Sequence, residues 1–214
     1  MNESANATTG LDHLVYAVPD LEAAIANLEA RLGVRAAHGG SHPGRGTRNA
    51  LIALSDFSYL EIIGRDPDQR DVGSPRWFGI DALSAPRIVT WAAKHPNVER
   101  LVAEAARSGL SLGRVASGSR QTPDGVTLRW QYTNPDALIE GGIVPFFIDW
   151  GTSPHPASSS PRGPMLLSLR AEHPEPGRVE HALSAVGVTL TISRASQTSL
   201  IATLNTEHGE VELR

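Results

Sequence analysis

The sequence predicts an α+β fold in which one βαβββ unit occurs twice in tandem and is followed by a third unit of the same kind. At three places a short apolar run leads into a proline, an amphipathic helix pattern and a glycine. After each helix pattern come two or three further apolar runs, separated by turn residues and not by another helix. Strands in such a series need only hairpin connections, so we expect a cupped, mixed sheet with largely antiparallel pairing.

The first unit begins with LDHLVYAV at residues 11–18. Apolar residues then recur at spacings of three and four from Leu21 to Leu32, which predicts a helix with one buried face. Asp20 is the expected N-cap, and Gly33 is the expected C-terminal stop. Strands are expected in NALIAL and YLEIIG.

The second unit opens with RIVTWAAKH and the third with MLLSLRAEH. Their helices are expected to begin after Asn97 and Pro174 and to end at Gly109 and Gly187. Later strands are expected in LGRVAS, VTLRWQYT and VPFFIDWG, and then in TLTIS, SLIATLN and EVELR. The turn signals PDG and EHGE separate strands as hairpin loops do. Agreement between three independent segments strengthens the prediction of a repeat.

The chain divides into four parts on this pattern. Residues 1–10 are expected to form a disordered tail, 11–150 the paired modules, 151–164 a linker, and 165–214 a third unit packed on the core. The linker and a second irregular stretch at 65–86 are longer than typical connections, so each is expected to cover a site or an interface. The third unit could extend the sheet, cap the second unit or pair with another subunit. Exposed strand edges need covering, so we expect a homodimer.

Composition excludes several functional classes. The net charge of −4 and pI of about 6.0 give no general attraction to nucleic acid or to anionic membranes. The absence of cysteine excludes disulfides, thiolate metal ligands and a cysteine nucleophile. No apolar run approaches the roughly 20 residues that span a bilayer, and no secretory signal is visible. We therefore expect a cytoplasmic protein with a small-molecule partner.

Several stretches carry a resemblance to a known family. They are LDHLVYAVPDLEAA, GGSHPGRGTRNALIAL with YLEIIG, PRIVTWAAK, PDGVTLRWQYT, GGIVPFFIDWG and the His-Pro pair at 155–156. In these the chain resembles the glyoxalase-like domain (glyoxalase-3-like) of the vicinal oxygen chelate superfamily, which includes glyoxalase I, extradiol dioxygenases and bleomycin-resistance proteins. The resemblance covers about residues 11–185. It implies that two paired units form a cupped sheet with the site inside the cup.

The resemblance also implies metal ligands on the first and last strands of each unit. In the first unit these positions hold His13 and Glu61. The second unit departs from the pattern, because Thr90 stands where a second histidine would be expected. At its last strand either Ile148 or Asp149 could face the cup. We favour Asp149, since an unpaired carboxylate is costly to bury elsewhere. The resulting set of His13, Glu61 and Asp149 suits Zn, Fe, Mn or Ni.

Each of these residues also has a simpler interpretation. His13 could be a polar group in the cup, hydrogen-bonded to a neighbour or ligand without a metal. Glu61 could be solvated on an outer face, or it could face inward and act as a general base near an acidic carbon. These alternatives remain open on the sequence.

Four residues are expected to contact substrate: Arg48, Asn49, Thr90 and Trp130. Arg48 and Asn49 lie in a glycine-rich segment, 39–50, which reads either as a hairpin loop over the cup or as a plain surface loop. Trp130 would favour an apolar or aromatic ligand if it lines the cup, but strand aromatics more often pack in cores. The histidines that precede prolines are expected to be conformational or surface features; they are His42, His95, His155 and His173.

Two functions follow from this pattern. The first is a metal-dependent lyase, isomerase or dioxygenase of the glyoxalase type, acting on vicinal oxygens of a small molecule. The second is a metal-free protein that binds or sequesters a small molecule in the same cup, and the missing histidine at Thr90 favours it. Whether the protein is an enzyme stays open at this stage.

Overall fold

The structure is a computed structural model that describes residues 10–69, 72, 75–122 and 124–214. The expected disordered tail, apart from Gly10, lies outside the described residues, as does Pro123 of one predicted turn. Within the described ranges, no helix has both the length and the apolar character that a bilayer crossing requires.

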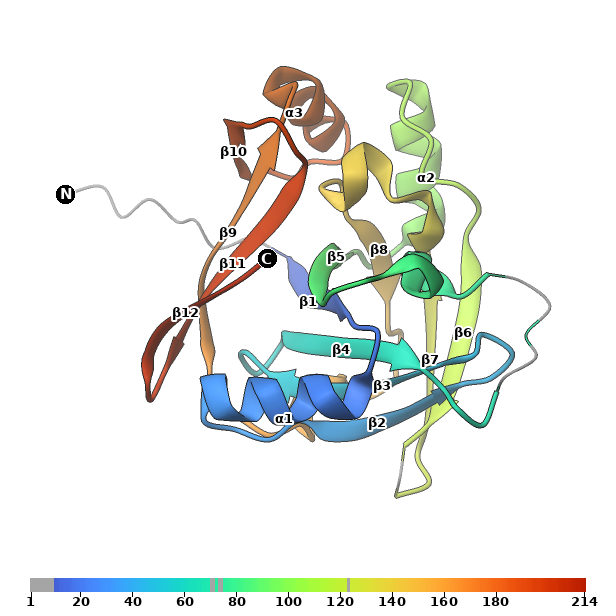
Figure 1. The fold of residues 1–214 in the computed structure, drawn as a ribbon. Helices are drawn as coiled ribbons and strands as arrows, with labels where there is room; N and C mark the ends of the chain where they lie inside the picture. The colour runs from blue at the N-terminus through green and yellow to red at the C-terminus, as the bar shows by residue number, and fades with distance from the viewer. Residues whose placement is uncertain (1–9, 70–71, 73–74, 123) are drawn as a thin grey trace.

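Each of the three units has the predicted order of elements (Figure 1). The first consists of β1 (Leu11–Ala17), α1 (Leu21–Leu32), β2 (Ala37–His42), β3 (Thr47–Ala53) and β4 (Tyr59–Arg65). The second consists of β5 (Arg87–Lys94), α2 (Val98–Arg107), β6 (Ala116–Gln121), β7 (Thr127–Tyr132) and β8 (Phe146–Asp149). The third consists of β9 (Met165–His173), α3 (Pro176–Ser184), β10 (Thr191–Arg194), β11 (Ser199–Thr206) and β12 (Gly209–Leu213). Four short 3-10 turns connect them: η1 (Trp77–Ala82), η2 (Pro135–Ala137), η3 (Ile139–Gly142) and η4 (Pro156–Ser158).

The first two units form one sheet of eight strands in the order β2-β3-β4-β1-β5-β8-β7-β6. In each unit the first strand pairs in parallel with the last, β1 with β4 and β5 with β8. The two units join where β1 and β5 pair antiparallel at the centre of the sheet. The sheet curls until its two edge strands approach each other, and the Arg120 guanidinium on β6 donates a hydrogen bond to the Gly39 carbonyl on β2. The predicted α+β tandem repeat is confirmed.

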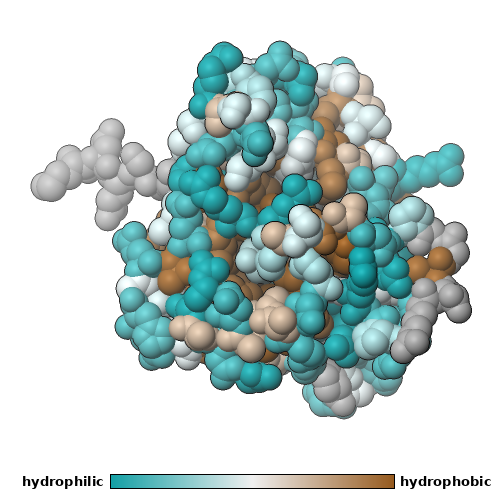
Figure 2. Space-filling view, viewed as in Figure 1, coloured by the Kyte–Doolittle hydropathy of each residue, from teal (hydrophilic) through white to brown (hydrophobic). Residues whose placement is uncertain are grey.

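The two faces of the curled sheet have different neighbours. On β1, Leu14 and Tyr16 point outward and belong to the apolar core that α1 completes. Val15 and Ala17 point inward and belong to a separate apolar cluster on the concave side. This alternation is the period of a strand buried on both faces. In Figure 2 the outer surface is mostly hydrophilic, and apolar surface shows mainly toward the centre of the view.

The third unit does not extend the main sheet. It forms its own four-stranded sheet in the order β10-β9-β11-β12. Leu169, Ala171 and Leu200 of this sheet belong to the same apolar core as α1. The backbone N–H of Ile88 on β5 donates a hydrogen bond to the carbonyl of Arg214, 2.8 Å away. The third unit and the outer face of the main sheet therefore share one apolar core.

The glycine-rich segment 39–50 is not a loop over the cup. Residues up to His42 form β2, and Thr47 already belongs to β3, so only residues 43–46 form the turn. A Cβ atom on Gly39 would overlap the side-chain oxygen of Asn49. Glycine at this position therefore lets the Asn49 side chain lie against the β2 backbone.

Candidate functional site

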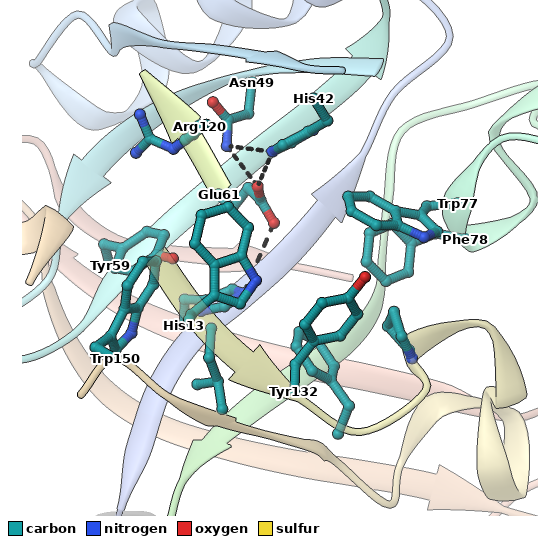
Figure 3. Close-up of a pocket in the computed structure, with 14 residues that line it drawn as sticks. His13, His42, Asn49, Tyr59, Glu61, Trp77, Phe78, Arg120, Tyr132 and Trp150 are labelled. Atoms are coloured by element: carbon teal, nitrogen blue, oxygen red, sulfur yellow. Dashed lines mark hydrogen bonds and ion pairs between the residues drawn. The ribbon is translucent and has the colours of Figure 1, made fainter. Parts of the chain in front are cut away.

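The concave face of the curled sheet holds a cavity with about 460 Å³ of empty space, part of it open to solvent. Half of its lining residues are tryptophan, tyrosine or phenylalanine, with Trp77, Phe78, Tyr132 and Phe146 among them. Polar side chains meet at one end, where His13, Glu61, Asn49, His42 and Arg120 line the cavity (Figure 3). A mainly apolar cavity with a few convergent polar groups is the usual form of a small-molecule site.

His13 and Glu61 come together inside this cavity although 48 positions separate them in the sequence. β1 and β4 are parallel neighbours, with His13 opposite Tyr59 and Val15 opposite Glu61. Both side chains therefore leave the same face of the sheet. His13 Nε2 lies 3.7 Å from Glu61 Oε2, and both side chains are at least nine-tenths buried.

A fully buried carboxylate, Asp12, orients the His13 ring. Asp12 Oδ1 lies 2.7 Å from His13 Nδ1. Its other oxygen accepts a hydrogen bond from Trp150 Nε1 at 3.0 Å and lies 3.1 Å from His155 Nε2. Burial opposes ionisation of Asp12, but the hydrogen bonds of His13 and His155, and the positive charge of these rings when they are protonated, outweigh it and hold the Asp12 pKa well below its usual value. Asp12 is therefore a carboxylate at neutral pH.

A strand irregularity makes the contact between these sequence neighbours possible. The pairing of β1 with β5 shifts register between Leu11 and His13, and Asp12 has no partner in that ladder. Such bulges change the direction of a side chain and recur beside active sites. The irregularity lets Asp12 and His13 interact although successive strand residues normally point to opposite faces.

Aromatic rings fix the plane of the imidazole. The ring of Tyr59 stacks on His13 with centroids 4.6 Å apart and an interplanar angle of 18°. Phe146 meets it edge-on at 5.5 Å. Since Nδ1 faces a carboxylate, we assign the Nδ1–H tautomer to neutral His13. Its Nε2 lone pair then points to the side of the cavity where Glu61 lies.

The other side of Glu61 is occupied by neutral groups. The Asn49 amide donates a hydrogen bond to Glu61 Oε1 at 2.6 Å, and His42 Nε2 lies 3.9 Å from the same oxygen. His42 Nδ1 lies 3.0 Å from the Thr47 hydroxyl. Burial lowers the pKa of His42 to about 4; Glu61 acts in the opposite direction, and the positive charge of Arg120 adds to the lowering. His42 is therefore neutral at neutral pH.

Two of the expected substrate contacts line the cavity, Asn49 and Trp130, and two do not. Arg48 lies toward α1 and donates a hydrogen bond to Glu22 at 2.9 Å. Thr90 donates a hydrogen bond to the Gly142 carbonyl at 3.0 Å and lines a separate, smaller cavity. The expectation that Arg48 and Thr90 line the main cup is therefore wrong.

The expected position of Asp149 is also wrong. Ile148 lines the cavity, whereas Asp149 lies on a groove outside it and accepts a hydrogen bond from the Gly151 N–H at 2.8 Å. That expectation assumes that a carboxylate outside the cup is too costly to bury. Asp149 is only half-buried, so no such cost arises.

Several site residues did not stand out in the sequence. Asp12 and Arg120 sit in ordinary strand patterns. His42 and His155 each precede a proline, which predicts a surface or conformational role. One signal did exist, because both irregular stretches contribute to the site. Trp77 comes from residues 65–86 and His155 from 151–164, the two segments whose length suggested that they cover something.

The donor set does not fit the divalent metal site that the resemblance implies. His13 and Glu61 would supply two ligands, while Ile148 and the hydrogen-bonded Thr90 occupy the corresponding positions of the second unit. Across the described ranges, no group of three or more histidine, aspartate and glutamate side chains is arranged to hold a metal ion. Glu61 Oε1 also accepts a hydrogen bond from the Asn49 amide, which reduces its capacity as a ligand. We therefore derive no chemical step through a metal.

Two paired βαβββ units around a cavity define the vicinal oxygen chelate fold, a class of proteins that act on or bind small molecules. The chain belongs to the family of glyoxalase-like domains, which its residues 11–187 match. No functionally curated protein matches the chain.

Comparison with solved structures supports the fold. The chain is similar to a hypothetical protein from Staphylococcus aureus, with 14% identity, a TM-score of 0.61 and coverage of 94% of this chain and 83% of that one. Weaker similarity extends to methylmalonyl-CoA epimerase from Mycobacterium tuberculosis, with 22% identity, a TM-score of 0.42 and coverage of 69% and 90%. The Streptomyces coelicolor methylmalonyl-CoA epimerase has 20% identity, a TM-score of 0.46 and coverage of 70% and 100%. At these identities the likeness concerns the fold alone.

Proposed function

We propose that this glyoxalase-like protein is an enzyme that moves a proton on a small carbonyl compound, with His13 as the base and without a resident metal. The observation that carries the proposal is the buried Asp12–His13–Glu61 array at the polar end of an aromatic cavity. Burying two carboxylates beside an imidazole costs free energy, and such arrangements gather where proton transfer is needed.

The geometry supports the following step. His13 Nε2 removes a proton from a carbon next to a carbonyl group, and the electron pair of that C–H bond becomes part of an enolate. The imidazolium formed lies between Asp12 at 2.7 Å and Glu61 at 3.7 Å, and both carboxylates stabilise its charge. Returning the proton from His13 Nε2 to the same carbon regenerates neutral His13. The 3.7 Å separation between His13 Nε2 and Glu61 Oε2 is too long for a hydrogen bond, so Glu61 does not engage the Nε2 atom and a substrate can approach it from the cavity.

Tyr59 is placed to assist the developing oxyanion. Its side chain lines the cavity next to His13. Burial raises its pKa well above the usual value, and the carboxylates of Asp12 and Glu61 raise it further. The phenol therefore stays protonated at neutral pH and can donate a hydrogen bond to an enolate oxygen.

Hydrogen–deuterium exchange tests the proposal directly. Small ketones, α-hydroxyketones and 2-oxo acids are incubated with the protein in D₂O, and loss of the carbon-bound proton is followed by NMR. We expect the protein to accelerate exchange in at least one class, and His13→Gln to remove about 100-fold or more of that acceleration. His38→Gln is the matched control, because His38 lies on β2 with an exposed side chain outside the cavity. Equal losses in both variants would refute the role of His13.

The alternative is a metal-free protein that binds a small molecule without reaction. Thr90 and Ile148 stand where the resemblance implies metal ligands, and this favours the alternative. The aromatic walls of the cavity can hold an apolar ligand without a metal. Measurable ligand binding without exchange in any class would support this alternative.

Elemental analysis of the purified protein and treatment with a chelator test whether the enzyme depends on a metal. We expect exchange to survive dialysis against a chelator. Activity that is lost on chelation and restored by a divalent ion would overturn the metal-free mechanism.

A further inference from the structure

Arg120 is a buried cation at the polar end of the cavity, and the step proposed above does not use it. It lies on β6, where Gly118 and Arg120 share the inward face and Ser119 points away. Only 5% of the Arg120 surface is exposed. In Figure 3 its side chain lies beside Asn49, with Glu61 between this group and His13.

The charge of Arg120 has no carboxylate partner within the described part of the chain. No acidic oxygen there lies within 4.0 Å of its guanidinium nitrogens, and its one protein hydrogen bond goes to the neutral Gly39 carbonyl. A guanidinium carries five N–H donors, so most of its hydrogen-bonding capacity is unused. Two other arginines differ, because Arg48 pairs with Glu22 and Arg76 with Asp81.

Burying an uncompensated cation is among the costliest arrangements in a folded protein. The hydrogen bond to Gly39 joins the two edge strands, but a neutral donor could form the same bond without this cost. An anion that enters the cavity would supply the missing charge. The guanidinium stays available to it, because His42 is neutral and Glu61 accepts its hydrogen bond from Asn49 and not from Arg120.

We infer that the substrate of the site is a small carboxylate with an apolar, ring-sized body, and that Arg120 binds its carboxylate group. This inference rests on the proposed function and names its substrate class. The planar fork of arginine matches a carboxylate in a two-point contact. Trp77, Phe78 and Phe146 pack the apolar body, and the chain of atoms between the two ends passes Glu61 and His13.

Matched pairs of probes test the charge requirement by isothermal titration calorimetry. Phenylacetate is compared with phenylacetamide, and 3-phenylpropanoate with 3-phenylpropanamide, because each pair differs mainly in charge. We expect the wild-type protein to bind the carboxylates at least about tenfold more tightly than the amides. Equal affinities within both pairs in the wild-type protein would overturn the inference without any variant.

Two variants locate the effect. Arg120→Gln should abolish the preference for the carboxylate, and Arg120→Lys should keep part of it. Arg48→Gln is the matched control, since it removes the same charge from an arginine paired with Glu22 outside the cavity, and it should leave the preference unchanged. A preference that survives in Arg120→Gln, or disappears equally in Arg48→Gln, would contradict the assignment.

Binding and reaction are read separately. A carboxylate preference that depends on Arg120, together with absent proton exchange, would support this site and refute the enzyme. Exchange that depends on His13 but favours neutral ketones over 2-oxo acids would support the enzyme and refute the carboxylate site at Arg120.

Discussion

Acidification should destabilise the protein through His42, a buried histidine that is neutral in the folded state. Its pKa is about 4 when folded, against a usual value of 6.5. Between these values the unfolded chain takes up a proton at this residue and the folded chain does not, so stability falls as the pH is lowered. The two pKa values differ by about 2.5, and one pKa unit corresponds to about 1.4 kcal/mol. The full effect is therefore about 3 kcal/mol, with about 2 kcal/mol already lost at pH 5.

Urea unfolding followed by tryptophan fluorescence measures this effect at pH values from 7.0 to 4.5. The informative quantity is the difference in pH dependence between the wild-type protein and His42→Gln, because other titrating groups cancel in it. We expect the variant to lose about 2 kcal/mol less between pH 7 and pH 5. His38→Gln removes an exposed histidine from the same strand and should behave like the wild type. Parallel curves for the wild-type protein and His42→Gln would show that the burial argument is wrong.

Three further substitutions test the site. Asp12→Asn removes the charge that holds His13, so we expect proton exchange to fall about 100-fold and unfolding free energy to fall by about 1–3 kcal/mol, and an unchanged exchange rate would exclude an orienting role. Phe146→Ala removes a buried ring that meets His13 edge-on, and it should lower the free energy of unfolding in urea by about 3 kcal/mol. A decrease below about 1 kcal/mol would mean that neighbouring side chains move in to fill the space left by the ring. Gly118→Ala adds a Cβ that would overlap the Trp130 ring, so we expect weaker carboxylate binding and altered tryptophan fluorescence, and unchanged values for both would show that the ring moves without consequence.

The helices and the repeat could be predicted because local signals agree with the packing. The Asp20 side chain accepts a hydrogen bond from the Ala23 N–H at 3.0 Å, and Gly33 adopts a left-handed conformation with φ of 74°. Each feature depends on one residue at a fixed position next to the apolar face of the helix, so the sequence indicates where the helix begins and ends. Asn97 caps α2 in the same way, through the Arg100 N–H.

Strand β2 could not be predicted from propensity. Its sequence, AHGGSH, combines glycines with polar residues, which are depleted in strands. Tertiary pairing with β3 determines its conformation. The glycines that weaken the strand signal are needed because Asn49 of β3 and the backbone of Gln121 on β6 come close to them.

The side chains facing the cavity were harder to predict than the elements that carry them. A register difference of one residue decides whether Ile148 or Asp149 lines the cup, and apolar neighbours on both sides of the strand do not reveal it. Asp12 depends on a local irregularity that alternation alone cannot show. The expected homodimer and cytoplasmic location stay predictions, because neither is a property of one folded chain.

The segment after β8 completes the surroundings of Asp12 in the proposed reactive centre. Trp150 and His155, which hold Asp12, follow every strand of the main sheet in the chain. All strands of the curled sheet are thus synthesised before the two side chains that bind Asp12, the residue that orients the proposed base His13.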